Sequence, residues 1–157
     1  WTVPDVRKRL KQLKQRGGKL VVIDPRRTET AELASEHHFI TPGTDALLLA
    51  AMLNTIFEEG LCDPADLADF VTGLDEVAAA VRVFTPEMAA PHTGIGADAI
   101  RAIARSLAGA ERGICYGRMG VSKQAYGALC QWLIQVINIA TGNLDKPGGS
   151  IDRKSVV

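Results

Sequence analysis

The segment that most constrains the fold is a short apolar stretch that runs directly into an acid, a proline and two arginines. Residues 20–23, written LVVI, are followed by Asp24, Pro25, Arg26 and Arg27. A strand that is apolar on both faces is typical of a parallel sheet covered by helices. Open α/β sheets bind ligands at the carboxyl ends of their strands. The stretch therefore predicts an α/β fold with a ligand-binding turn at Asp24.

The rest of the chain alternates between helical and extended patterns. Helices are predicted within residues 3–18, from about residue 28, and within 45–60, 63–73, 74–84, 96–110 and 125–142, with a short one from residue 85. Residues 38–41 and 113–117 are predicted to be extended, and residues 118–124 to form a loop. Alternating strands and helices indicate an open, mostly parallel sheet of few strands with helices on both faces, similar to dinucleotide-binding domains. Partner strands could lie outside the chain, because three strands are few for its 157 residues.

Charge and cysteine content exclude several classes of protein. The chain has 18 basic and 18 acidic residues, which argues against a general electrostatic affinity for nucleic acid or for acidic membranes. Seven of the basic residues lie between positions 7 and 19, where a solvated helix face is preferred over a nucleic-acid contact. The longest apolar run, residues 46–57, is too short to span a bilayer, so no membrane insertion is expected. Three cysteines without a CxxC pair predict neither a zinc site nor an iron–sulfur site, and each is expected to be a small buried residue.

Three polar turns contain the residues suited to bind a phosphorylated nucleoside. Asp24 could accept hydrogen bonds from ribose hydroxyls, with a helix cap or a surface turn as the alternative. Arg26 or Arg27 could face a phosphate, and Thr28 could cap the following helix. In the second turn, Asp45 could accept both donors of a guanine edge or act as a helix cap, a role that Thr44 could also fill.

The third turn, YGRMGVSKQ, occupies residues 116–124. Its glycines would allow close backbone approach to a ligand, and Arg118 and Lys123 supply positive charge. The turn matches neither GxxxxGK[ST] nor GxGxxG, which argues against a kinase-type nucleotide site and against a standard NAD site. The three histidines show no metal-binding spacing, no catalytic set can be argued from residue order, and no catalytic residue is predicted.

Two blocks of sequence resemble the molybdopterin oxidoreductases of the dimethyl sulfoxide reductase family. They are VVIDPRRTETAELASEHHFITPGTDALLLAAMLNTIFEEGL and YGRMGVSKQAYGALCQWLIQVINIATGNLDKPGG. The resemblance implies a role in binding molybdopterin guanine dinucleotide, two copies of which hold one molybdenum in this family. It implies that the turns contact the nucleotide through Asp24, Pro25, Arg26, Arg27, Thr28, Gly43, Thr44, Asp45, Gly117, Arg118, Met119, Gly120 and Lys123.

The same resemblance implies that other parts of the enzyme lie outside this chain. The cysteine motif for a 4Fe–4S cluster and the molybdenum ligand are absent here, so the chain alone is expected to be inactive. Residues 1–149 are expected to be one domain of a larger enzyme similar to formate dehydrogenase or nitrate reductase, and residues 150–157 a tail that need not be native. The expected partners are the remaining domains and an iron–sulfur electron-transfer subunit, in the cytoplasm or periplasm of a prokaryote.

Two other classes of protein remain as alternatives. A non-enzymatic nucleotide-binding α/β module would use the same acid at the end of a strand. A nicotinamide dehydrogenase is disfavoured by the missing glycine fingerprint. The sequence alone leaves the substrate, the direction of the reaction and the compartment open.

Overall fold

The structure is a computed structural model that describes residues 5–150. It divides into two compact units, one ending at Pro42 and the other beginning at Gly43, and each is described by itself. The described residues are mostly helical, with one small parallel sheet of two strands. The α/β class predicted from the sequence is therefore confirmed, with two strands in place of the three expected.

The first unit contains two strands and two helices. In chain order they are α1 (Val6–Gln15), β1 (Val21–Ile23), α2 (Glu29–Leu33) and β2 (Glu36–His38). The strands pair in parallel, with Val22 opposite His37. The prediction of a strand at the LVVI stretch is confirmed, although its residues are half-buried in this unit. The second strand begins two residues earlier than predicted and ends at His38.

Two polar side chains begin the helices of the first unit as the sequence indicates. The Asp5 carboxylate accepts a hydrogen bond from the Lys8 backbone N–H (3.3 Å) at the start of α1. The Thr28 hydroxyl accepts one from the Ala31 N–H (3.3 Å), so the predicted cap of α2 is confirmed. Each bond satisfies a backbone donor that the first turn of a helix leaves unpaired. The sequence also favours Pro4 for the first turn of α1, but that residue lies outside the described residues.

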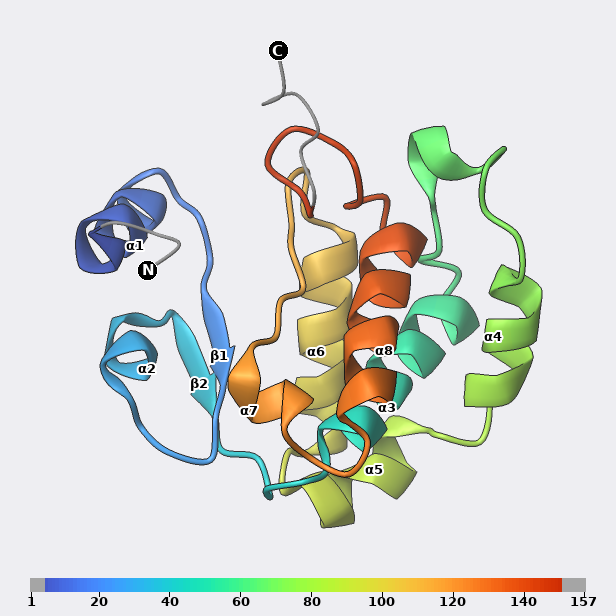
Figure 1. Ribbon diagram of the computed structural model, residues 1–157, viewed down its shortest axis with the longest axis horizontal. Coiled ribbons are helices and arrows are strands. Elements are labelled where there is room, and N and C mark those ends of the chain that lie inside the picture. Colours follow the sequence, from blue (N-terminus) through green and yellow to red (C-terminus); the bar gives the residue numbers. More distant parts are fainter. Residues whose placement is uncertain (1–4, 151–157) are drawn as a thin grey trace. The chain divides into compact units, whose positions relative to one another are not determined.

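The second unit is a helical assembly around α3 (Figure 1). Its elements are α3 (Asp45–Glu58), a 3-10 turn η1 (Ala65–Leu67), α4 (Leu74–Val81), α5 (Pro86–Thr93), α6 (Ala97–Ala108), α7 (Met119–Ser122) and α8 (Gly127–Ala140). Helix α3 packs against α4, α5, α6 and α8, and its residues 48–56 are all buried. This burial agrees with the sequence, in which apolar residues occupy most of the helix circumference. The sequence does not predict α7, which lies within the predicted loop at residues 118–124. The helix predicted within residues 63–73 is instead the single turn η1.

The predicted strand at residues 113–117 is wrong, because these residues form no ladder with another strand in the described part of the chain. Side chains from the end of α8 replace the missing strand. The Asn138 amide accepts from the Cys115 N–H (2.8 Å) and donates to the Cys115 carbonyl (2.9 Å). The Asn143 side chain accepts from the Gly113 N–H (2.9 Å). The segment is therefore held by two asparagines, a pairing that hydrophobic patterning does not register.

The three cysteines are unpaired, and their environments differ. Cys130 is fully buried, whereas Cys62 and Cys115 are partly buried. Burial raises the pKa of the Cys115 thiol to about 12, so it stays protonated at neutral pH. Only Cys130 matches the expected small buried residue in full. No helix within residues 5–150 is long and apolar enough to cross a bilayer.

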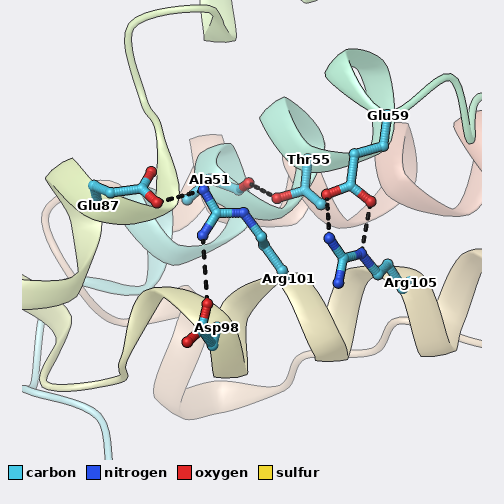
Figure 2. A network of polar contacts seen from close by, with 7 residues as sticks. All are labelled: Ala51, Thr55, Glu59, Glu87, Asp98, Arg101 and Arg105. Carbon is cyan, nitrogen blue, oxygen red and sulfur yellow. Dashed lines mark hydrogen bonds and ion pairs between the residues drawn. The ribbon is translucent and has the colours of Figure 1, made fainter.

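A network of charged side chains links the outer surfaces of α3, α5 and α6 (Figure 2). The Arg105 guanidinium donates two hydrogen bonds to the Glu59 carboxylate, at 2.6 and 2.8 Å. Arg101 pairs with Glu87 and lies 3.8 Å from the Asp98 carboxylate. The arginines of α6 therefore contact acids at the end of α3 and the start of α5.

This network predicts a dependence of stability on pH. The hydrogen bond from Arg105 lowers the pKa of Glu59 below its ordinary value of 4.5. Because the unfolded chain then binds the proton first, this contribution is present above about pH 4.5 and is lost as pH falls through the folded-state pKa. We expect Glu59→Gln to flatten the fall in the free energy of unfolding below about pH 4.5, measured by urea denaturation at several pH values. Glu58→Gln, at the neighbouring exposed position, is the matched control, and an unaltered slope in Glu59→Gln would contradict the prediction.

Candidate functional site

The first predicted site segment is the turn that follows β1. The Asp24 carboxylate accepts a hydrogen bond from the Arg26 backbone N–H (2.8 Å), the geometry of an Asx turn. The Asp24 carbonyl lies 3.1 Å from the His37 ring nitrogen Nε2. One carboxylate oxygen of Asp24 therefore holds the turn, which is the surface-turn role that the sequence left as an alternative. Its other oxygen has no hydrogen bond within the described residues.

The cations of this turn lie at the surface. Pro25, Arg26 and Arg27 are exposed, and neither arginine forms an ion pair with a described residue. Thr28 is already occupied as the cap of α2. The turn can thus present two planar guanidinium groups to an anion such as a phosphate.

The second predicted segment leads into α3. Gly43 has φ +86°, a conformation that glycine adopts without steric cost. Thr44 occupies the N-cap position without a side-chain capping bond, and Asp45 is the first residue of the helix. Neither side chain is therefore the helix cap that the sequence offered as the alternative to ligand binding. Half-buried Asp45 is held by a different contact.

That contact comes from Gln124, a residue that sequence reasoning missed. Its Nε2 donates to the Asp45 Oδ2 atom (2.9 Å) and to the Gly120 carbonyl (3.4 Å). The amide therefore joins the turn before α3 to the segment around α7, which are two of the three predicted site segments. No spacing signal could have revealed this pair, because the residues are 79 positions apart.

The segment around α7 is further held by α8. The Gln131 side-chain amide donates to the Gly117 carbonyl (3.3 Å) and to the Ser122 hydroxyl (3.0 Å). The Arg118 carbonyl accepts from the Ser122 N–H (3.0 Å) and from the Ser122 hydroxyl (3.1 Å). The predicted loop is therefore an ordered turn of helix with its backbone tied at both ends.

Gly117 and Gly120 have different surroundings. A Cβ atom on Gly117 would lie 2.7 Å from the Ile134 Cδ1 atom, so a side chain here would press against α8. A Cβ on Gly120 would meet nothing within 4 Å. Only Gly120 therefore leaves the open space beside the backbone that a ligand could use, as the sequence predicted for both.

The charge distribution of the joined segments is uneven. Arg118, Met119 and Lys123 are exposed, and neither cation forms an ion pair with a described residue. Asp45 likewise forms no ion pair there, although its carboxylate is half-buried. After burial, which is the larger cause, the charge of Asp45 further raises the pKa of the Cys130 thiol.

The second unit thus brings together a carboxylate that accepts only from a neutral amide, an open glycine and two unpaired cations. Such a set can accept donors from a base and bind the phosphates of a nucleotide. Asp24 to Thr28 belong to the first unit, where Arg26 and Arg27 are exposed. Within residues 5–150 there is no cluster of histidine, cysteine and acidic side chains that could hold a metal ion. Of the three histidines, His92 is exposed.

Comparison with known proteins identifies the family of the chain. The sequence pattern of the family described as molybdopterin oxidoreductase matches residues 2–156. The chain is 35% identical over 139 residues to formate dehydrogenase H from Escherichia coli, covering 88% of this chain and 19% of that protein. It is 33% identical over 158 residues to a nitrate reductase from Symbiobacterium thermophilum, covering 94% of this chain and 21% of that protein.

A solved structure shows the same likeness. Acetylene hydratase from Pelobacter acetylenicus superposes with a TM-score of 0.81 at 29% identity, covering 87% of this chain and 19% of that one. The chain therefore spans about a fifth of the length of the relatives it matches.

Proposed function

Because the chain belongs to the molybdopterin oxidoreductase family, we propose that it binds the guanosine and phosphate end of a molybdopterin guanine dinucleotide within a larger two-electron oxidoreductase. The observation that carries the proposal is the Asp45–Gln124 hydrogen bond, which joins two segments and leaves a carboxylate without a cation. A carboxylate accepts two donors in one plane, which suits the guanine edge. The family name implies the molybdopterin, and the guanine dinucleotide form is our proposal.

Each segment has a separate role in this proposal. Asp45 accepts from the guanine base, with Gly43 and Thr44 shaping the approach to it. Arg118 and Lys123 neutralise phosphate charge, while Gly120 leaves space beside the backbone and Met119 covers the ligand. In the first unit, taken by itself, the second carboxylate oxygen of Asp24 suits a ribose hydroxyl, in a turn completed by Pro25, Arg26, Arg27 and Thr28.

The whole enzyme would contain parts that this chain does not. The bound cofactor would supply molybdenum for two-electron transfer, and the residues of this chain would hold and orient its nucleotide end. We propose that the parent resembles formate dehydrogenases and nitrate reductases, with its molybdenum ligand, a 4Fe–4S cluster and an electron-accepting partner supplied from outside residues 1–157. One structural relative is named a hydratase, so the two-electron reaction proposed for the parent enzyme should be tested directly.

The proposal predicts a loss of bound nucleotide when the Asp45 charge is removed. In the full-length parent, Asp45→Asn should weaken cofactor binding by about 10- to 150-fold, because charged hydrogen bonds contribute about 1.5–3 kcal/mol. The measurement is GMP released by acid hydrolysis per polypeptide, after dialysis at limiting cofactor. Asp69→Asn, at an exposed position on the same unit, is the matched control.

Two outcomes would decide between the classes of protein. Unchanged GMP content in Asp45→Asn would remove the guanine role of this residue. A parent protein that releases no GMP and no molybdopterin, yet binds free nucleotides tightly, would favour the non-enzymatic nucleotide-binding module instead.

A further inference from the structure

The geometry points to Gln124 as a specificity-determining residue that, together with Asp45, selects guanine through its 2-amino group. This inference rests on the proposed function, since it concerns the base of the nucleotide bound at the same site. The sequence identified Asp45 alone, and the structure adds a second side chain next to it.

The orientation of the Gln124 amide follows from its partners. The Asp45 carboxylate and the Gly120 carbonyl are both acceptors, so the nitrogen of the amide must face them. A flipped amide would place its oxygen against two other oxygens and lose both hydrogen bonds. The carbonyl oxygen Oε1 of Gln124 is therefore directed away from these two partners.

That oxygen is the unusual atom of the site. Gln124 Oε1 is buried and has no hydrogen-bond partner within the described residues. A buried acceptor without a donor costs free energy, so binding of a donor at this position would be favoured. The adjacent Asp45 Oδ1 atom also accepts no hydrogen bond from a described residue. The hydrogen-bonded pair of Asp45 and Gln124 therefore has two acceptor atoms without a donor, Asp45 Oδ1 and Gln124 Oε1.

The ligand that fits is a planar group with several neighbouring donors. Guanine presents its N1–H and the two hydrogens of its 2-amino group along one edge. Hypoxanthine keeps the N1–H but lacks the amino group, and adenine presents an acceptor at N1. Asp45 can accept the N1–H and one amino hydrogen, which leaves the second amino hydrogen for Gln124 Oε1.

Because Gln124 Oε1 is buried, access to it requires a small movement of the chain around Gln124. Arg118, Met119 and Gly120 are all exposed, and α7 has only four residues. The open space beside Gly120 allows this segment to shift while Gln131 still ties Gly117 to α8. A hydrogen bond between the 2-amino group and Gln124 Oε1 thus requires residues 118–124 to move.

The test compares two nucleotides on the full-length parent prepared without cofactor. Dissociation constants for GMP and IMP are measured by calorimetry on wild type, Gln124→Met and Gln131→Met. Wild type should prefer GMP by at least about fivefold, the range expected for one net hydrogen bond. Gln124→Met should lower the GMP-to-IMP affinity ratio by about fivefold, mainly by weakening GMP, because Asp45 still accepts one of the two amino hydrogens.

The control variant separates specificity from loop anchoring. Gln131→Met also removes an amide that ties the 117–123 segment, yet it does not touch Asp45. It should lower both affinities together and preserve the GMP-to-IMP ratio. An equal change of the ratio in both glutamine variants would show an anchoring role only and would overturn the inference.

The result also distinguishes this inference from the proposed function. Wild type that binds GMP and IMP equally well would refute the role of Gln124 and leave nucleotide binding intact. Wild type that binds neither nucleotide, at concentrations where the cofactor itself is bound, would refute the proposed function.

Discussion

Replacing Asn138 with leucine is expected to lower the free energy of unfolding by roughly 2–6 kcal/mol, because two backbone groups would lose their partner at about 1–3 kcal/mol each. Asn138 is fully buried on α8, and its amide bonds both the N–H and the carbonyl of Cys115. Leucine has nearly the same size and offers neither a donor nor an acceptor. The loss should appear as a lower midpoint in urea denaturation followed by circular dichroism.

A second substitution at position 138 separates the contributions of the two hydrogen bonds. Asn138→Asp keeps an acceptor for the Cys115 N–H and, when ionised, has no donor for the Cys115 carbonyl, so the ionised form should be at least as destabilising as one lost bond. Lowering pH to protonate the aspartate restores a donor and should recover part of the stability. A leucine variant within about 0.5 kcal/mol of wild type, the usual range for surface changes, would show that this pairing contributes little.

The second large effect is expected from Gly127→Ala at the start of α8. A Cβ atom there would lie 2.1 Å from the Ser122 carbonyl oxygen, which belongs to the backbone and cannot rotate away. Overpacking of this kind costs about 1–3 kcal/mol, and we expect the upper part of that range or more. The structural consequence is a displaced 118–124 segment and a weakened Asp45–Gln124 hydrogen bond.

Gly120→Ala provides the matched control for this prediction. Position 120 lies in α7, where a Cβ would meet nothing within 4 Å, and alanine favours helix by about 0.5–1 kcal/mol. Thermal unfolding of the two variants should therefore move in opposite directions. Equal stabilities for Gly127→Ala and wild type would mean that the contact between Ser122 and the start of α8 relaxes at no cost.

Local sequence patterns were sufficient for most of the helices and for the family. The apolar circumference of residues 45–60 correctly indicated a central helix, and the Thr28 cap was recognisable from its position before α2. The quoted blocks led to the molybdopterin oxidoreductase family, which the match over residues 2–156 confirms. These features depend on neighbours within one or two turns of the chain, so a single sequence records them directly.

Local patterns give wrong predictions where a segment forms its hydrogen bonds with residues far away in the sequence. Residues 113–117 have the pattern of a buried strand, yet their backbone N–H groups donate to the side chains of Asn138 and Asn143. The predicted loop at 118–124 contains α7, because α8 and α3 supply hydrogen bonds to it. A hydrogen bond between distant residues leaves no periodic trace in the sequence.

The candidate site shows the same division. Residue type and position at element ends were enough to single out Asp24, Asp45 and Arg118 as polar groups suited to a nucleotide. Folding alone revealed that Gln124 binds Asp45 and that its own oxygen remains without a donor. The physical reason is that the chemistry of a side chain is local, whereas the partner that orients it is chosen by packing of segments far apart in the chain.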